Sequence, residues 1–247
     1  MSRRHRSSLL LGFLLSLVVA APVAAAPVGI ARSAGGALPL PACRYDAVRT
    51  RYDRPPQWRK SLLDTIYKLP RSYEPGSLAS TSRAGLNGGY LIRSSVVDDL
   101  SAPARAARAA GASVAVQSAY RSYAAQKSTF QYWVDQVGYQ RALEVSARAG
   151  HSEHQLGTTI DFRSASSTRA PWDYDDRATT APGRWMKRNA WHYGFLMSYP
   201  KGKRSESCYS YEPWHYRYVA RDTAAAVRER RVTLRRYLWE TWETAPS

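Results

Sequence analysis

A chain of 247 residues is long enough to bury a real core and fits one ordinary domain with additional segments. Its 36 lysines and arginines outnumber its 19 acidic residues, which gives a formal net charge of +17 at pH 7. This balance indicates attraction to polyanions such as nucleic acid, anionic lipid or an acidic cell wall. After the amino-terminal leader no stretch is apolar enough to span a bilayer as a helix, so we expect the mature protein to be soluble.

Residues 1–26 have the order of a secretory signal peptide. Arg3, Arg4 and Arg6 form a positive head, residues 9–21 are apolar, and small residues follow. An uncleaved anchor is the alternative, although the apolar run is short for a membrane span. We expect an exported protein in the extracellular space, the cell wall or the periplasm. Loss of the three arginines lowers its formal charge from +17 to +14. Because of export, we expect anionic cell-wall polymers rather than nucleic acid as electrostatic partners.

Residues 27–42 are small, apolar and rich in proline and glycine, which indicates a linker. The mixed aromatic and charged composition that follows continues without a second linker, so residues 43–247 are predicted to form a single domain. Cys43 and Cys208 are the only cysteines of the chain. In an oxidising compartment such a pair is most simply a disulfide.

The hydrophobic patterning of the domain predicts helices and strands that do not alternate strictly. Helices are expected at 61–70, 96–111, 122–137, 139–150 and 221–238, the first ended by Pro70 and the fourth capped near Gly150. Strands are expected at 112–120, 158–162 and 212–219, and residues 183–195 should pass from helix into strand. This mixture indicates an α+β fold: one domain with a small central antiparallel sheet flanked by helices.

Chemically reactive side chains are concentrated in GHSEHQLGTTIDF, residues 150–162, and EPWHYRYV, residues 212–219. In the first stretch His154 precedes Asp161 by seven residues, an odd offset that would place them on opposite faces of a continuous strand. Gly157 lies between them and permits a sharp turn. After such a turn Asp161 could face back towards His154.

In the second stretch Glu212 precedes His215 by three residues, and Pro213 interrupts regular strand pairing between them. Two histidines and one carboxylate with an open fourth position make a catalytic zinc site. A nearby carboxylate that is not a ligand can act as the general base. The ligands would be His154, Asp161 and His215, and the base Glu212. On spacing alone, an ordinary pairing of histidines with acids is an equal alternative.

Both stretches resemble the zinc motifs of the VanY-type D-alanyl-D-alanine carboxypeptidases. These belong to the LAS superfamily, named for lysostaphin, D-Ala-D-Ala metallopeptidases and sonic hedgehog. The resemblance continues in SAYRSYAAQ at residues 118–126, in RNAWHYGFLMSYP and in YKLPRSYEPGSL, and covers roughly residues 58–240. It implies the LAS peptidase fold, one Zn²⁺ per chain and hydrolysis of peptidoglycan stem peptides.

The resemblance also implies catalytic roles. It places zinc on His154, Asp161 and His215 and makes Glu212 the catalytic base. Arg121 matches the family arginine that holds the substrate and supports the oxyanion. Its guanidinium suits that role because it can bind a carboxylate or a tetrahedral intermediate with two prongs.

Further positions match the family's substrate pocket. Gln126, Ser152 and Trp214 correspond to residues that line it. Thr159 stands where many members carry alanine, and this departure concerns specificity rather than zinc binding. We expect His151 to be a surface residue beside the motif.

Several functions remain compatible with these residues. The first expectation is removal of the terminal D-alanine from a pentapeptide stem. The alternatives are an L,D-carboxypeptidase, a cell-wall endopeptidase, a non-catalytic zinc-stabilised wall-binding module, and a polyanion-binding protein whose charge is its function. We expect a monomer.

Overall fold

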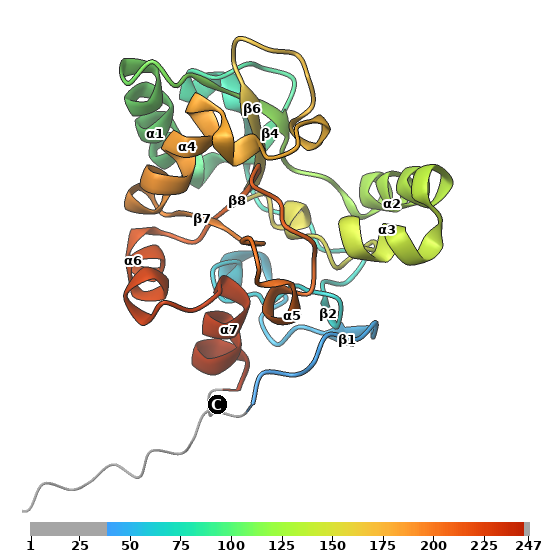
Figure 1. Cartoon of the computed structure of the whole chain (residues 1–247). Helices are drawn as coiled ribbons and strands as arrows, with labels where there is room; N and C mark the ends of the chain where they lie inside the picture. Colours follow the sequence, from blue (N-terminus) through green and yellow to red (C-terminus); the bar gives the residue numbers. More distant parts are fainter. Residues whose placement is uncertain (1–38, 245–247) are drawn as a thin grey trace, which may run out of the picture. The chain divides into compact units, whose positions relative to one another are not determined.

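The structure of residues 39–244, a computed structural model, is built around a four-stranded antiparallel sheet with strand order β5-β6-β8-β7 (Figure 1). The predicted leader, and the predicted linker up to residue 38, lie outside the described residues. Within the described range no helix is both long and apolar enough to cross a membrane. The strands are β5 (Val114–Ser118), β6 (Thr159–Ser164), β7 (Phe195–Met197) and β8 (His215–Tyr218).

Two small sheets and several helices surround the central sheet. A parallel pair is formed by β1 (Val48–Arg49) and β2 (Tyr67–Lys68), and an antiparallel pair by β3 (Leu78–Ser80) and β4 (Leu91–Arg93). The described α-helices are α1 (Val97–Ala109), α2 (Tyr123–Val137), α3 (Tyr139–Val145), α4 (Ala181–Asn189), α5 (Arg204–Ser207), α6 (Arg221–Arg230) and α7 (Leu234–Leu238). Short 3₁₀ turns are η1 (Pro55–Gln57), η2 (Thr81–Ala84), η3 (Ser94–Val96), η4 (Glu153–Leu156), η5 (Pro171–Asp173), η6 (Arg177–Thr179) and η7 (Ala190–Tyr193), and η8 (Trp239–Glu243) is a π-helical turn.

The two faces of the central sheet differ in chemistry because side chains alternate along each strand. On β6, Ile160 and Phe162 belong to the main hydrophobic cluster, so Asp161 between them faces the other side. On β8, Tyr216 belongs to the same cluster, whereas the neighbouring His215 stands in register with Asp161. One face of the sheet is therefore the core and the other carries polar groups.

The helices cover the apolar face and build a second core. Leu100 of α1 and Met186 of α4 are buried in the main cluster, and both helices contact strands of the central sheet. In a second cluster, residues of α6 and α7 pack with buried residues from other parts of the chain. Its members are Leu62, Leu196, Val219, Ala224, Val227, Leu234, Tyr237 and Leu238. The α+β prediction with a small antiparallel sheet is confirmed.

The prediction of a helix at residues 61–70 is wrong. The segment is a loop followed by the short strand β2. Asp64 explains the difference, because its Oδ1 accepts hydrogen bonds from the backbone N–H groups of Ile66 and Tyr67, each at 2.7 Å. Such local bonds offer the backbone an alternative to helical pairing. The loop is buried, so tertiary packing stabilises it further.

The expected helix at 139–150 is shorter than predicted, and the expected disulfide is present. Helix α3 ends at Val145, because Ser146 is extended with φ −148° and ψ 137°. Cys43 and Cys208 are bonded, which ties the start of the described chain to the loop before β8. The other predicted helices and strands occur with shifted ends.

Candidate active site

A tight turn brings the first histidine of the predicted centre next to β6. His154 lies in the 3₁₀ turn η4, whose start is capped by the Ser152 hydroxyl accepting from the His154 N–H at 3.3 Å. Gly157 ends the turn with φ +71°, and an added Cβ there would lie 3.0 Å from Pro75. The chain then enters β6, so that Asp161 returns to His154 as the glycine pattern predicted.

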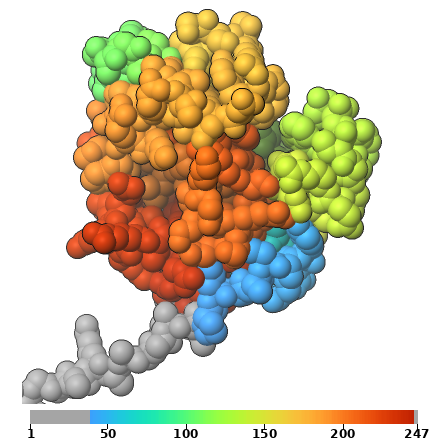
Figure 2. Space-filling model, in the orientation of Figure 1, coloured from blue at the N-terminus to red at the C-terminus, as the bar shows by residue number. Residues whose placement is uncertain are grey.

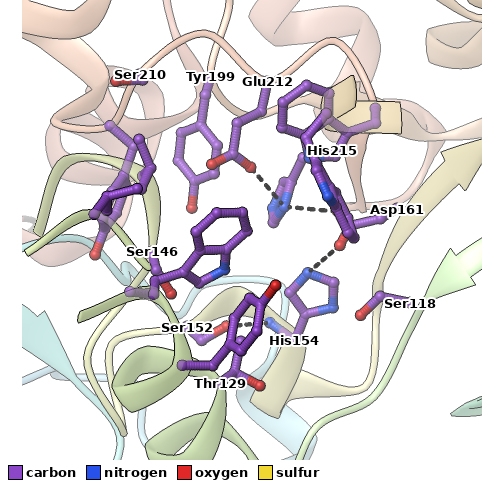
Figure 3. Close-up of a pocket in the computed structure, with 18 of the residues that line it drawn as sticks. Ser118, Thr129, Ser146, Ser152, His154, Asp161, Tyr199, Ser210, Glu212 and His215 are labelled. Carbon is purple, nitrogen blue, oxygen red and sulfur yellow. Dashed lines mark hydrogen bonds and ion pairs between the residues drawn. The ribbon is translucent and has the colours of Figure 1, made fainter. Parts of the chain in front are cut away.

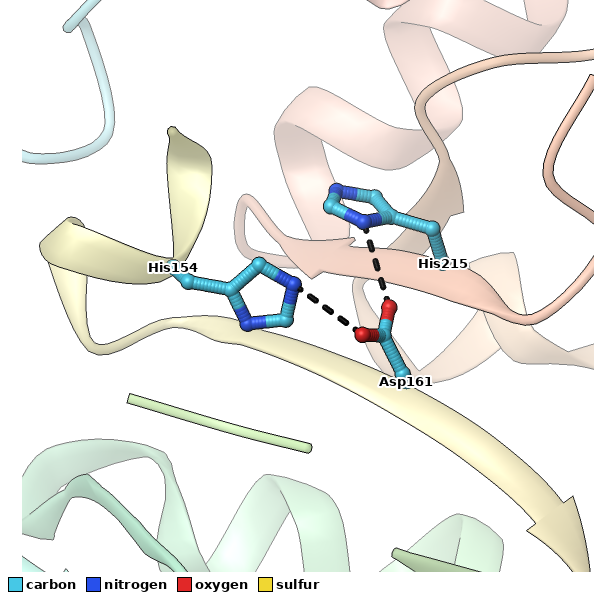
Figure 4. A group of neighbouring side chains, drawn as sticks. All are labelled: His154, Asp161 and His215. Carbon is cyan, nitrogen blue, oxygen red and sulfur yellow. Dashed lines mark ion pairs between the residues drawn. The ribbon is translucent and has the colours of Figure 1, made fainter. Parts of the chain in front are cut away.

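Three side chains converge at this point on the polar face of the sheet (Figure 4). His154 Nε2 lies 3.3 Å from Asp161 Oδ2, and His215 Nδ1 lies 3.2 Å from Asp161 Oδ1. One ligand atom from each of the three residues lies within 4.8 Å of the others, and all three side chains are buried. The predicted metal ligands are thus brought together by η4, β6 and β8.

The outer nitrogen of each imidazole is already engaged. His154 Nδ1 lies 2.6 Å from the Ala119 carbonyl, which can only accept, so this nitrogen carries the proton. His215 Nε2 lies 2.9 Å from Glu153 Oε2. Both inner nitrogens are consequently directed at the Asp161 carboxylate. Hydrogen bonds of this kind orient histidines that bind metal ions.

The donor set fits a divalent cation. With Nδ1 protonated, a neutral His154 directs its Nε2 lone pair at an electron-rich carboxylate oxygen. Burial, reinforced by Arg121, lowers the pKa of His154 to about 4, so the imidazole is neutral near pH 7. Among residues 39–244, the buried Asp161 Oδ1 has no hydrogen-bond donor of good geometry. A cation between these atoms would satisfy both groups.

Negative charge surrounds His215. Burial would lower the pKa of this imidazole, but its contacts with Asp161 and Glu153 outweigh that effect and raise the pKa to about 10. Burial would raise the pKa of Asp161, but His154 and His215 hold it well below its usual range. The centre therefore favours a positive charge at this place, which a metal ion would supply.

Glu212 lies beside the three converging side chains and borders the same cavity. Its Oε2 is 3.5 Å from His215 Nδ1, and 13% of its side chain is exposed (Figure 3). Burial, with a contribution from Asp161, raises the pKa of Glu212 to about 8. A carboxyl group with a pKa near neutrality suits a residue that accepts and returns a proton.

Arg121 also faces this cavity. Its Nη1 is 3.7 Å from Asp161 Oδ2, and it is held by hydrogen bonds to Ser118 and Gln126. A register shift between Val116 and Ser118 sets Ser118 opposite Asp161 and so aligns this support. Burial lowers the pKa of Arg121, yet a guanidinium stays charged in proteins.

The predicted pocket residues separate into two groups. Ser152 and Trp214 line a cavity of about 760 Å³ together with the predicted centre. Gln126 is fully buried and does not border this cavity. Its Oε1 accepts from Arg121 Nε at 2.8 Å and its Nε2 donates to the Ala147 carbonyl at 2.6 Å. Gln126 therefore positions Arg121.

The expectation for His151 is wrong, and Thr159 lies away from the cavity. His151 is buried, with Nδ1 2.8 Å from the Asp64 carbonyl. This contact links the segment just before η4 to the loop at 61–70 that replaces the predicted helix. Thr159 is fully buried in β6 and does not border the cavity.

The structure adds a buried support that the sequence interpretation missed. Glu153 Oε2 contacts His215 and accepts from Ser198 Oγ, while its Oε1 accepts from Arg217 Nη1 at 3.0 Å. Burial would raise the pKa of Glu153, but Arg217 and His215 lower it to about 2. The signal in the sequence was the acidic residue directly before His154, inside the stretch in which reactive side chains are concentrated.

A family model described as VanY, D-alanyl-D-alanine carboxypeptidase, matches residues 90–221 of the chain. The matched range is more than half of the chain and includes His154, Asp161, Glu212 and His215. The chain therefore belongs to the VanY family of D-alanyl-D-alanine carboxypeptidases.

Individual proteins of this kind are similar over most of the described residues. YodJ of Bacillus subtilis, itself named only as a candidate carboxypeptidase, is 36% identical over 183 residues, covering 72% of this chain and 66% of that protein. The chain spans about two thirds or less of the curated relatives it matches.

Two solved structures share the fold. The LD-carboxypeptidase LdcB is 33% identical with a TM-score of 0.64, over 74% of this chain and 87% of that one. A variant of the vancomycin-resistance D,D-pentapeptidase VanY, in complex with Zn(II), is 27% identical with a TM-score of 0.63, over 73% and 99% of the two chains. Both likenesses support the predicted LAS-type peptidase fold.

Proposed function

We propose that the protein is an exported, zinc-dependent D-alanyl-D-alanine carboxypeptidase that removes the terminal D-alanine from peptidoglycan stem peptides. The observation that carries this proposal is the placement of Glu212. A buried carboxyl group with a raised pKa borders the cavity 3.5 Å from a histidine of the convergent centre. A purely structural metal site has no need of such a group.

Zinc is the metal that the donor set favours. Two imidazole nitrogens and one carboxylate oxygen, from His154, His215 and Asp161, are the ligand types of catalytic zinc sites. The solved VanY neighbour was obtained in complex with Zn(II). When bound, such an ion supplies Lewis acidity to the reaction.

Glu212 would act as the general base and then as the general acid of the hydrolysis. In hydrolysis the attacking water must lose a proton, and the departing amine must gain one. Glu212 can perform both transfers because its carboxyl group borders the cavity and its pKa lies near neutrality.

Arg121 would provide positive charge where the substrate becomes negative. Its guanidinium faces the cavity beside Asp161, and Gln126 and Ser118 fix its orientation. Preplaced cations stabilise charge that develops on the tetrahedral oxygen, and a guanidinium also binds a terminal carboxylate with two prongs.

Incubation of the purified mature protein with defined four- and five-residue stem peptides, followed by mass spectrometry, tests the activity. The expected product is the pentapeptide less one D-alanine. Glu212→Gln should abolish turnover and retain one zinc per chain, whereas His154→Ala should lose the zinc. Full activity of the Glu212→Gln protein would remove Glu212 from the mechanism. Zinc binding without any hydrolysis would favour a wall-binding module.

A second candidate is L,D-carboxypeptidase activity, which the likeness to LdcB favours. This activity would shorten the four-residue stem instead of the five-residue stem. An endopeptidase would cut inside the stem and would tolerate amidation of the terminal carboxylate. If Arg121 binds that carboxylate, amidation should slow hydrolysis roughly ten- to a hundredfold, as loss of a charge-assisted hydrogen bond does.

Export is supported by the order of charged, apolar and small residues in 1–26 and by the disulfide between Cys43 and Cys208. Expression of the whole chain in a secreting bacterial host tests it. The expected result is a shortened protein outside the cytoplasm with no free thiol. A full-length protein in the cytoplasmic fraction would contradict export.

A further inference from the structure

The cavity extends well beyond the predicted reaction centre. Its volume of about 760 Å³ lies in the upper part of the range of roughly 300–1,000 Å³ in which drug-sized ligands are buried. Its lining includes His154, Asp161, Glu212 and His215. The same cavity is also lined by aromatic side chains, some of them on α2 and the turn η5.

Four of these aromatic residues form a continuous row from the reaction centre to the surface. Trp214 directly precedes His215, and its ring lies 6.2 Å from that of Trp172. Trp172 lies 6.2 Å from Trp133, and Trp133 lies 5.4 Å from Tyr132. All three contacts are edge-to-face, and all four residues border the cavity.

The outer half of the row does not serve the protein core. Within α2 only Gln126 is buried, and α2 with α3 protrudes from the body of the molecule (Figure 2). Tyr132 is 56% exposed and Trp172 is 40% exposed. Large aromatic side chains that border a cavity yet remain this exposed typically bind a ligand.

We propose that Tyr132 and Trp133 bind a pyranose ring of the glycan to which the stem peptide is joined. This inference rests on the proposed function and names a second part of its substrate. The apolar C–H face of a pyranose stacks on an aromatic face, while its hydroxyl and acetamido groups need hydrogen-bonding neighbours. Gln136 of α2 and Asp173 of η5 also line the cavity and offer such groups.

The length of the row agrees with this assignment. In a pentapeptide stem four residues separate the sugar from the bond that is cut, and four extended residues span at most about 13–14 Å. From Trp214 outward, the ring centres are separated by 6.2, 6.2 and 5.4 Å. An extended stem with its cleaved bond at the reaction centre is therefore long enough to pass Trp172 and bring its sugar to Trp133, with Tyr132 one ring further along the row.

Matched substrates test the inference on the full mature protein. We compare kcat/KM for an N-acetylated pentapeptide with kcat/KM for the same peptide carrying N-acetylmuramic acid at its amino end. Neither substrate has a free amino group, so the sugar is the difference. The parent protein should prefer the muramyl peptide roughly three- to tenfold, the range expected for one aromatic contact.

Variants of one exposed side chain locate the effect. Tyr132→Ala should abolish most of the preference, whereas Tyr132→Phe, which retains the aromatic face, should preserve it. Tyr139→Ala is the control, because Tyr139 is 54% exposed on the neighbouring helix and does not border the cavity. Equal use of both substrates by the parent protein would overturn the inference. An equal loss on both substrates in Tyr132→Ala would also overturn it.

A binding experiment separates failure of this inference from failure of the proposed function. Titration of the parent protein with tri-N-acetylglucosamine, followed by tryptophan fluorescence, requires no hydrolysis. Binding that is weakened in Tyr132→Ala but not in Tyr139→Ala supports the sugar subsite even if no peptide is cut. Hydrolysis of both peptides without saturable sugar binding would leave the carboxypeptidase proposal standing and remove the subsite.

Discussion

Two buried aspartates, Asp64 and Asp161, show how the same residue type can stand either in a structural ion pair or in a candidate metal centre. Asp64 Oδ1 accepts from two backbone N–H groups, and its Oδ2 accepts from Arg235 Nε at 2.6 Å. Both of its oxygens thus have donors. Asp161 instead meets two imidazole nitrogens, and its Oδ1 lacks a well-aligned donor within the described part of the chain.

The difference lies in where the protons are. Around Asp64 the neighbours are obligate donors, so the lone pairs are satisfied within the protein. Around Asp161 the ring proton of His154 points outward to the Ala119 carbonyl, so the inner nitrogen of this imidazole offers a lone pair instead. Buried acceptors without donors are costly, so a cation bound at this place would stabilise the group. The same substitution, aspartate to asparagine, at each position tests this difference.

Removal of the Asp161 charge should give the largest effect. In Asp161→Asn the centre loses its anionic ligand, and we expect zinc affinity to fall by more than roughly a hundredfold, beyond the ten- to hundredfold that residues behind the ligands contribute. The free energy of unfolding of the metal-free protein should also fall, because His154 and His215 hold the pKa of Asp161 well below its usual range. Competition with a chromogenic chelator measures the affinity. Unchanged zinc binding would exclude Asp161 as a ligand.

The same substitution at Asp64 should act on stability alone and leave zinc affinity unchanged. Asp64→Asn leaves Arg235 buried without its counter-charge, since the two side chains are 1% and 4% exposed. Breaking a buried pair in this way typically costs about 3–5 kcal/mol. Denaturant unfolding should show the loss, while the folded fraction should still bind one zinc per chain. Loss of zinc from the folded fraction would show that the two centres are not independent.

Glu153 connects the charged core to the ligand centre, so its substitution should give an intermediate effect. Glu153→Gln removes the negative charge that His215 and Arg217 share. We expect zinc affinity to fall about ten- to a hundredfold. Glu144→Gln, a surface carboxylate paired with Arg141 and Arg204, is the control and should bind zinc like the parent. Equal affinities in all three proteins would assign Glu153 to folding alone.

The parts of the site that follow local rules were predictable from sequence. Alternation along 158–162 and the glycine at position 157 were sufficient to place Asp161 near His154. The Glu212–His215 spacing and the family resemblance supplied the rest of the predicted centre. These features depend on backbone geometry within a few residues, which the local sequence largely determines.

The features that depend on distant partners were not predictable in this way. The local hydrogen bonds of Asp64 in the loop at 61–70 are accompanied by an ion pair with Arg235, which lies 171 positions later in the chain and which the local sequence does not reveal. Burial of His151 has the same origin, because its partner is the Asp64 carbonyl. Glu153 gains its role only when β8 brings His215 and Arg217 to it. Tertiary contacts decide these positions, and no periodicity records them.

The pH dependence of stability should contain a contribution from His151. Burial, reinforced by Arg148, lowers the pKa of His151 to about 4, against about 6.5 when unfolded. The unfolded chain therefore binds more protons between these values, and stability falls as the pH drops from 6.5 towards 4. At pH 5 the loss relative to pH 7.5 is about 2 kcal/mol from this group.

His151→Asn tests this contribution, because an amide can still donate to the Asp64 carbonyl without titrating. Denaturant unfolding of both proteins, in the same metal state, gives the difference in stability at pH 5 and at pH 7.5. The variant should lose about 2 kcal/mol less than the parent over this interval. Parallel pH profiles would show that His151 does not titrate in the folded protein as we expect.

The smallest expected change in stability concerns the Thr159 hydroxyl, which is buried without a hydrogen-bond partner in the described part of the chain. Within residues 39–244, the buried Thr159 Oγ1 has no hydrogen-bond partner, although it lies only two positions before Asp161. Among the described residues no imidazole lies beside this hydroxyl, so it is not part of a metal centre. Its missing hydrogen bond therefore only lowers the stability of the fold. Thr159→Val keeps the shape of the side chain and should raise the free energy of unfolding by about 1 kcal/mol.

A second buried threonine provides the control for this prediction. Thr81 Oγ1 donates to the Asn87 carbonyl at 2.6 Å, so Thr81→Val should lower the free energy of unfolding by about 1 kcal/mol. Opposite signs of the change in the free energy of unfolding would show that a buried polar atom without a hydrogen-bond partner destabilises the fold. If Thr159→Val were as destabilising as Thr81→Val, the Thr159 hydroxyl must have a partner such as a buried water. A buried water could then also be the partner of Asp161 Oδ1. Zinc titration of the parent protein would decide whether water or a metal ion occupies that position.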